Sequence, residues 1–281
     1  MLSVSVVPNK LRNIPDPPSQ LFVKGYSVNE LLERPCVAVV GSRKVSAYGK
    51  AVTAALAGDL ARAGVLIISG LALGVDSIAH IAALDAGGLT LAVLPSPVEQ
   101  IYPAAHEQLA KRIIAQGGAL VSEYPAGAPV YRLNFVERNR IASGLCDALL
   151  ITEAAEKSGT LHTANFALEQ GKPVLAVPGN ITSLTSVGTN NLIKTGATPV
   201  TSAADVLQAL GIETGKAAKQ PPKGDSPAEQ ALLDLLWGGV SDGAELLARS
   251  GLEPAPFNQA LTMLEIHGQI RALGANRWAL Q

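Results

Sequence analysis

The sequence predicts an α/β protein: an extended Rossmann-like core with a doubly wound, mostly parallel sheet, and a small C-terminal winged-helix domain. Short, almost wholly apolar segments alternate with helix-patterned segments between residues 36 and 195. Strands that a parallel sheet buries on both faces have this composition. A polar segment then separates this alternation from three helical patterns and two short strands, which is the order of a winged helix.

The chain has four expected parts. Residues 1–34 contain four prolines and little periodicity, so we expect an extended lead-in with an edge strand near residues 21–23. Residues 35–210 form the core. Residues 211–225 are polar, with three lysines and a Pro-Pro pair, and are expected to be a linker. Residues 226–281 form the winged-helix domain.

The expected elements follow from apolar runs, from helical spacing and from glycines at the junctions. The strands are expected at 36–40, 65–69, 89–94, 119–122, 147–152, 173–178, 269–273 and 277–280, with Gly274 at the turn between the last two. The helices are expected near 48–63, 75–86, 104–116, 134–144, 160–170, 189–195, 226–236, 241–250 and 255–267.

Composition limits the function classes. The net charge is -1, with 22 basic and 23 acidic side chains in 281 residues, so a globally basic body that binds nucleic acid by bulk charge is excluded. Cys36 and Cys146 lie in apolar segments and are expected to pack in the core. No apolar run has membrane-spanning length and no signal pattern opens the chain, so we expect a cytoplasmic protein without a membrane partner.

Three loops are predicted at the carboxyl ends of strands, where doubly wound sheets bind ligands. They are Gly41-Ser42-Arg43-Lys44, the segment from Ser69-Gly70 to Asp76, and Lys157-Ser158-Gly159-Thr160. Backbone N–H groups at helix N-termini, hydroxyls and cations suit an anionic oxygen. The glycines alone could simply make short turns, but three such loops together favour an anion site. Neither GxGxxG nor a Walker A motif occurs, and the loops do not separate a nucleotide from a polynucleotide.

A second feature favours a polynucleotide. Tyr131, Arg132, Phe135, Arg138 and Arg140 lie within ten residues of one another, together with Asn139. In a helix, Phe135, Arg138 and Asn139 share one face. An aromatic ring among guanidinium groups can stack a base and neutralise its phosphates. The alternative is a core Phe135 with solvated arginines.

Several motifs in order resemble the DNA-processing protein A (DprA, Smf) family. They are VVGSR (39–43), SGLALGVDSIAH (69–80), FVERNRIASGL (135–145), SGTLHTA (158–164), AVPGN (176–180) and GTNNLIKTGA (188–197). The resemblance implies a Rossmann-like core that binds and protects single-stranded DNA and helps load the recombinase RecA in natural transformation. It also implies a homodimer, a DML1-like winged helix and no established catalytic reaction. Neither the cysteines nor His106 and His162 show metal-ligand spacing, so we expect no metal, and we expect no cofactor. The helical domain with which family members often begin is expected to be lacking here.

The resemblance also assigns the site, with Arg43 in a phosphate pocket and the segment around Phe135 facing DNA. Arg138 or Arg140 could instead be held in internal ion pairs. The expected DNA- or phosphate-binding residues are Ser42, Arg43, Ser69, Gly70, Arg132, Phe135, Arg138, Asn139, Arg140, Lys157, Ser158, Gly159 and Thr160. The helix near residues 191–195 is the expected dimer surface.

The principal alternative is a nucleotide-binding enzyme of the lysine-decarboxylase-like class, the nucleotide phosphoribohydrolases, to which the core is distantly similar. Their PGGxGTxxE motif is absent, since no such glutamate follows Pro178-Gly179-Asn180. Asp76 and His80 could form an acid/base pair, but we expect Asp76 to steady the phosphate loop and His80 to pack in the core. Glu153 is expected to hydrogen-bond a loop. A protein-interaction scaffold with an unused pocket is the third alternative.

The winged helix is expected to contact protein rather than duplex DNA. Residues 226–281 carry three basic and six acidic side chains, and the predicted recognition helix near 255–267 has no lysine or arginine. A recognition helix that enters the major groove needs cations to neutralise phosphates. Arg271 and Arg277 could contribute a weak accessory DNA site.

Overall fold

The computed structural model describes residues 2–5, 7–212, 222–274 and 276–280. The chain divides into two units, Met1–Thr214 and Gly215–Gln281, and each is described by itself. Of the expected linker, residues 213–221 lie outside the described residues.

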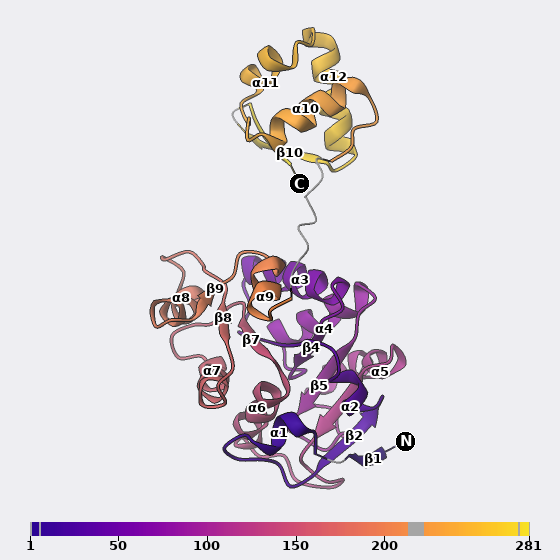
Figure 1. Ribbon diagram of the computed structural model, residues 1–281, viewed down its shortest axis with the longest axis vertical. Helices are drawn as coiled ribbons and strands as arrows, with labels where there is room; N and C mark the ends of the chain where they lie inside the picture. The colour runs from indigo at the N-terminus through magenta and orange to yellow at the C-terminus, as the bar shows by residue number, and fades with distance from the viewer. Residues whose placement is uncertain (1, 6, 213–221, 275, 281) are drawn as a thin grey trace. The chain divides into compact units, whose positions relative to one another are not determined.

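Within the described residues of the first unit, nine strands form one sheet in the order β1-β2-β6-β5-β4-β3-β7-β8-β9 (Figure 1). The pairs from β6 to β9 are all parallel, and β2 joins β1 and β6 by antiparallel pairing. The predicted doubly wound, mostly parallel sheet is therefore confirmed. The strands are β1 (Leu2–Ser5), β2 (Leu21–Gly25), β3 (Cys36–Val40), β4 (Leu66–Ser69), β5 (Thr90–Leu94), β6 (Ala119–Ser122), β7 (Ala148–Ile151), β8 (Val174–Ala176) and β9 (Thr198–Pro199).

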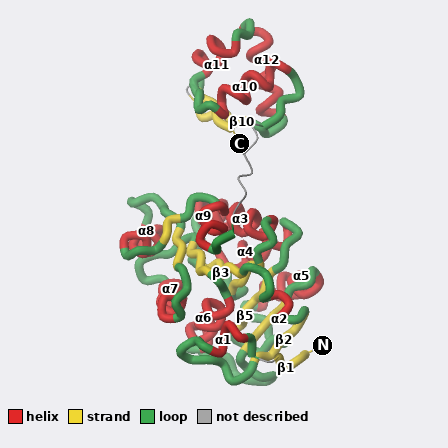
Figure 2. Tube along the Cα trace, viewed as in Figure 1, coloured by secondary structure: helices red, strands yellow, loops and turns green. Residues whose placement is uncertain are grey.

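Helices cover both faces of this sheet (Figures 1 and 2). They are α1 (Asn9–Arg12), α2 (Val28–Leu31), α3 (Ala47–Arg62), α4 (Val75–Asp85), α5 (Glu107–Ala115) after the 3-10 turn η1 (Ala104–His106), α6 (Asn134–Leu145), α7 (Thr160–Glu169), the 3-10 turn η2 (Leu184–Ser186), α8 (Val187–Lys194) and α9 (Ala203–Ala209).

Strand β3 explains why the central segments are apolar throughout. Cys36, Ala38 and Val40 pack in the cluster that includes residues of α6 and α7, whereas Val37 and Val39 pack in the cluster under α3 and α4. Successive side chains of a strand point to opposite faces, so a sheet covered on both sides leaves no position for a polar residue.

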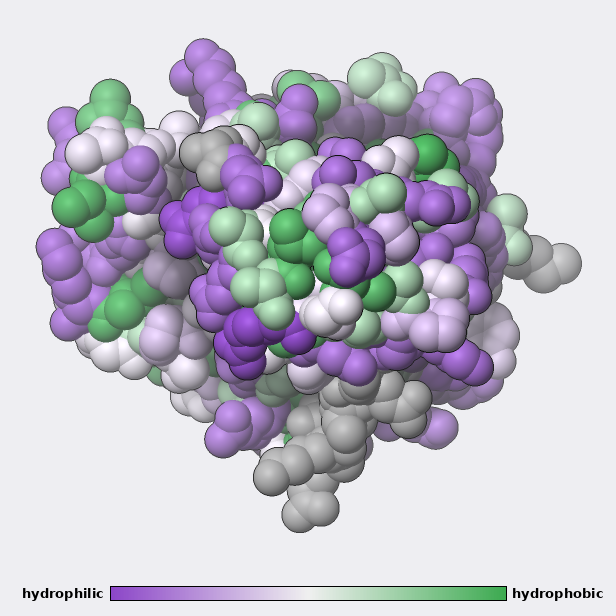
Figure 3. Space-filling view, turned by 90° about the horizontal axis from the view of Figure 1, so that it is seen from above, coloured by the Kyte–Doolittle hydropathy of each residue, from purple (hydrophilic) through white to green (hydrophobic). Residues whose placement is uncertain are grey.

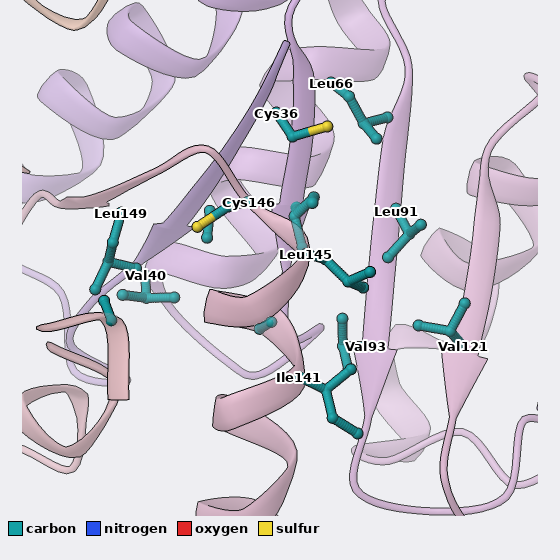
Figure 4. Close-up of a cluster of buried hydrophobic side chains, with 14 of the residues drawn as sticks. Cys36, Val40, Leu66, Leu91, Val93, Val121, Ile141, Leu145, Cys146 and Leu149 are labelled. Atoms are coloured by element: carbon teal, nitrogen blue, oxygen red, sulfur yellow. The ribbon is translucent and has the colours of Figure 1, made fainter. Parts of the chain in front are cut away.

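Both cysteines belong to the first of these clusters (Figure 4). Cys36 and Cys146 are fully buried free thiols. Burial raises the pKa of Cys36 to about 11 and that of Cys146 to about 12. Both thiols therefore stay protonated and unreactive at neutral pH, as expected of core residues.

The lead-in is more regular than the sequence indicates. A strand is present at 21–25 as expected, but β1 forms the edge and β2 lies inside the sheet. The expectation of a merely extended segment is also wrong, because α1 and α2 form there. Each is a single helical turn that buries one or two apolar side chains, too short for a periodic pattern to reveal, among them Leu11 and Leu31.

The second unit contains three helices and a hairpin around its own core. The elements are α10 (Pro227–Trp237), α11 (Gly243–Ser250), α12 (Pro254–Ile266), β10 (Ile270–Gly274) and β11 (Arg277–Leu280). Gly274 pairs with Arg277 as the last residue of β10, so the turn lies beyond it and includes Asn276 at φ 57°. The predicted winged-helix order is confirmed.

Among the described residues, no helix is long and apolar enough to cross a bilayer. Figure 3 shows hydrophilic residues interspersed with small groups of apolar ones on the face seen from above.

Candidate nucleic-acid interface

A pocket of about 560 Å³ opens at the carboxyl ends of the central strands, where the sequence predicts an anion site. Most of its lining comes from the loop after β3, one face of α6, and the loop that leads into α7 with the first turn of that helix. Ala72 and Asp76 after β4, and Thr185 of η2, complete it. Eight of the thirteen expected site residues meet there: Ser42, Arg43, Phe135, Arg138, Asn139, Ser158, Gly159 and Thr160.

One exposed cation of this pocket, Arg43, lies against an aromatic ring. The Cζ atom of Arg43 is 5.4 Å from the centroid of the Phe135 ring. Tyr102 packs on Phe135 edge to face, with centroids 5.0 Å apart and planes at 77°. Within the described part of the chain, Arg43 forms no ion pair. Its guanidinium is therefore held in place without its charge being neutralised, as binding to an anion requires.

The loop after β3 is fixed by backbone hydrogen bonds and by Glu153. Ser42 donates its N–H to the Glu153 carbonyl at 2.8 Å, and Val75 donates to the Ser42 carbonyl at 3.1 Å. The Glu153 carboxylate accepts from the backbone and hydroxyl of Ser46 and is 1% exposed. Glu153 therefore positions the loop as expected, and its carboxylate does not line the pocket.

The second cation of the pocket is buried. Arg138 is 4% exposed and donates through Nη1 to the carbonyl oxygens of Gly70, at 2.6 Å, and Val93. Burial lowers the pKa of Arg138 to about 10, and the nearby carboxylate of Asp76 opposes that shift. The guanidinium is still charged at neutral pH and forms a fixed positive floor of the pocket.

The first residues of the loop after β4 hold Arg138 and do not line the pocket, although Ala72 and Asp76 farther along do. The Ser69 hydroxyl is fully buried and donates to the Val39 carbonyl at 2.6 Å. The Gly70 N–H donates to Asp76 at 3.1 Å, and so does the N–H of Ala72, at 3.4 Å. Neither Ser69 nor Gly70 lines the pocket, so their assignment as anion donors is wrong. Asp76 steadies this loop as expected.

Arg140 is also misassigned as a DNA-facing residue. Its guanidinium donates to both carboxylate oxygens of Glu123, at 2.9 and 2.8 Å, and pairs with Asp16 at 2.7 Å. The side chain is 8% exposed. Residues two apart on a helix point to different sides, so Arg140 lies away from Arg138 and the pocket. Its ion pair with Asp16 joins α6 to the lead-in. This is one of the internal ion pairs that the sequence allowed for Arg138 or Arg140.

Arg132 and Lys157 lie outside the pocket. Both are exposed, and neither is among the residues that line it. Arg132 comes just before α6 and Lys157 just before Ser158, so both flank the lined surface.

Besides Asp76, three polar residues of the pocket are absent from the expected site list: Lys44, which the sequence places in the first anion loop, and Thr163 and Thr185, which it missed. Thr163 lies one turn after Thr160 on α7, so it could have been found from its spacing. Thr185 comes from η2, which carries no recognisable anion motif.

His80 is a core residue and not an acid or base. It is fully buried, and its Nδ1 lies 2.6 Å from the Thr90 hydroxyl. That hydroxyl donates to the Ile67 carbonyl at 2.7 Å, so Nδ1 must be the donor to Thr90. Burial lowers the pKa of His80 to about 3, which keeps the ring neutral.

Comparison with known protein families assigns both units. Residues 4–211 match the family model of DNA recombination-mediator protein A, and residues 216–276 match that of the DprA winged helix domain. The chain belongs to the DprA family. The DprA of Mycobacterium tuberculosis is 40% identical over 237 residues, and the protein Smf of Escherichia coli is 45% identical over 203 residues. These matches cover 82% and 72% of this chain but only 61% and 54% of those relatives.

Solved DprA structures share the fold. The DprA of Streptococcus pneumoniae is 41% identical, with a TM-score of 0.67 over 72% of this chain and 70% of that one. The DprA of Helicobacter pylori is 33% identical, with a TM-score of 0.67 over 74% of this chain and 95% of that one. The structure of the Helicobacter protein concerns its binding of single-stranded DNA.

Proposed function

We propose that this DprA-family chain binds single-stranded DNA in the pocket of Arg43 and Phe135, protects it, and helps to load RecA onto it during transformation or recombination. The observation that carries the proposal is the unneutralised Arg43 guanidinium beside the Phe135 ring. The family membership and the single-stranded DNA-binding mode of the Helicobacter relative support it.

The pocket has separate groups for the two parts of a nucleotide. Arg43 and Lys44 supply cations, and Gly159 lines the pocket at the start of the ten-residue helix α7, where the helix dipole favours an anion. The N–H and hydroxyl of Ser158 donate within the loop, to Ala155 and Thr160. Phe135 supplies a ring for base stacking, which tolerates every base. A base in a duplex is already stacked and paired, so the single strand should be preferred.

We propose further that the protein acts without catalysis. In the phosphoribohydrolase alternative a carboxylate must reach the glycosidic bond. The best candidate, Glu153, is instead hydrogen-bonded to Ser46 away from the pocket lining. The Asp76 carboxylate lines the pocket, but its Oδ2 accepts the backbone N–H groups of Gly70 and Ala72 and so holds that loop.

The assembly is proposed to be a cytoplasmic homodimer that places two pockets near each other, with the helix near residues 191–195 at the interface. The winged helix is proposed to bind protein rather than duplex DNA. Helix α12 has no lysine or arginine, and its exposed positions include Gln259, Thr262 and Ile266. Arg249 pairs with Glu245 at 3.1 Å.

Fluorescence anisotropy tests the binding step. A labelled poly-dT oligonucleotide should bind more tightly than duplex of equal length, and its affinity should fall with added salt because phosphate neutralisation releases counterions. Equal binding of both DNAs would contradict the proposal. RecA loading is tested by RecA filament formation on DNA precoated with single-strand-binding protein. The chain should accelerate it, and no acceleration would remove that part of the proposal.

A further inference from the structure

One carboxylate of the second unit is buried without a cation. Glu229, on the first turn of α10, is 6% exposed. Its Oε2 accepts the backbone N–H of Asp225 at 2.8 Å. Within the described residues, no hydrogen bond reaches its Oε1 and no lysine, arginine or histidine pairs with it. Buried carboxylates are ordinarily paired with a cation or bound to a metal.

Two further side chains that could bind a metal lie near Glu229: a second carboxylate from the segment just before α10 and an imidazole from the end of α12. Asp225 precedes the N-cap residue of α10, and His267 is the C-cap residue of α12. The Nδ1 of His267 lies 3.5 Å from Oδ2 of Asp225. The ligand atoms of Asp225, Glu229 and His267 all lie within 4.8 Å of one another.

These separations are close to those of a metal site. Two ligands of a tetrahedral zinc ion, each bound at the usual length, lie about 3.4 Å apart. The Asp225–His267 pair already has this spacing. Closing the third ligand onto the ion needs side-chain movement on the order of 1 Å.

We propose that Asp225, Glu229 and His267 bind a Zn²⁺ ion at the start of the winged-helix unit. One imidazole and two carboxylates make a three-ligand set that leaves the fourth position to water. The imidazole favours zinc over magnesium or calcium, which prefer oxygen ligands. Helix capping alone explains the hydrogen bond from the Glu229 N–H to the Ser226 hydroxyl, but it does not explain the approach of His267.

The ion would fasten the segment before α10 to the end of α12. One contact already joins these parts, because Gln269 Nε2 donates to the Lys223 carbonyl at 3.1 Å. The same segment is held to α10 by the Gly224 N–H, which donates to Gln230 Oε1 at 2.9 Å. Zinc therefore stabilises the winged-helix unit at the point where the chain enters it. This role is independent of DNA binding in the first unit.

Titration calorimetry of the chelator-treated full chain with zinc chloride tests the site. One equivalent should bind, and His267→Ala and Asp225→Asn should each weaken binding at least tenfold. His162→Ala, which removes a histidine of α7 in the first unit, is the matched control and should bind like wild type. Absence of stoichiometric binding, or equal binding by wild type, His267→Ala and Asp225→Asn, would overturn the proposal.

A second readout separates loss of the site from misfolding. Both tryptophans of the chain, Trp237 and Trp278, lie in the second unit, so tryptophan fluorescence reports on this unit alone. Zinc should raise its thermal midpoint in wild type and His162→Ala, and leave it unchanged in Asp225→Asn. A rise in Asp225→Asn equal to that in wild type would contradict the site. Poly-dT affinity should be the same with and without zinc, so failure of either proposal leaves the other standing.

Discussion

Arg138 occupies the space in which a side chain on Gly70 would lie, and it donates to the Gly70 carbonyl at 2.6 Å. A Cβ atom at residue 70 would collide with the guanidinium. The glycine that the sequence presents as an anion-binding turn is therefore required for a different reason: it leaves room for the buried cation under the pocket.

Gly70→Ala should consequently act through Arg138. We expect a loss of stability of about 1–3 kcal/mol, because the displaced guanidinium leaves buried carbonyl groups unsatisfied, together with weaker poly-dT binding. Urea unfolding and anisotropy measure the two effects. Gly58→Ala is the control, since a Cβ there meets only ordinary contacts in the middle of α3, and it should be neutral or slightly stabilising. Equal behaviour of the two variants would refute the role of Gly70.

Phe135 and Tyr102 should matter for base stacking. Phe135→Leu should weaken poly-dT binding by about 1–3 kcal/mol, the usual contribution of one stacked base. Tyr102→Leu should have a smaller effect, because it removes only the edge contact that orients Phe135. The matched comparison is an abasic oligonucleotide, on which wild type and both variants should bind alike. A Phe135→Leu deficit that persists on abasic DNA would argue against stacking.

Arg140 should contribute to stability and not to DNA binding. Arg140→Ala leaves the Glu123 carboxylate without its bidentate partner, and breaking such a buried pair costs roughly 3 kcal/mol. Urea unfolding should reveal this loss, whereas the poly-dT affinity of the folded variant should match wild type. A selective loss of affinity at unchanged stability would return Arg140 to the DNA-binding surface.

His80 predicts a pH dependence of stability. Its pKa is lowered to about 3 in the folded chain from an ordinary 6.5, so the unfolded chain binds the proton more readily between these values. His80 therefore costs stability as the pH falls below 6.5, by at most about 1.4 kcal/mol per pH unit. Urea midpoints at pH 7 and pH 5 should differ less in His80→Asn than in wild type. The same pH dependence in both proteins would exclude His80 as its source. Burial raises the pKa of Asp76, so Asp76 contributes stability that is lost as the pH rises, which is the opposite pH dependence. Wild type and His80→Asn share this contribution, so it does not affect their comparison.

The local sequence pattern was sufficient to predict the sheet, but it could not predict what individual arginines bind. Strands such as β3 are apolar throughout because both faces are covered, and this is visible in sequence. The role of Arg140 depends on Asp16, 124 residues away, and no local spacing reveals such a partner. The prediction that Ser69 binds an anion was wrong for a similar reason, because its hydroxyl donates to the Val39 carbonyl on the adjacent strand. Thr185 joins the pocket only through the path of the chain after β8.

The salt dependence of poly-dT binding by wild type and Arg43→Ala tests the central claim most directly. The account predicts that Arg43→Ala binds much more weakly and that its log–log salt slope is shallower by about 0.7, the value for one lost single-strand phosphate contact. Arg62→Ala, which removes an exposed arginine paired with Asp59 on α3, should retain the wild-type affinity and slope. Wild-type binding by Arg43→Ala would contradict the claim that this pocket holds the DNA.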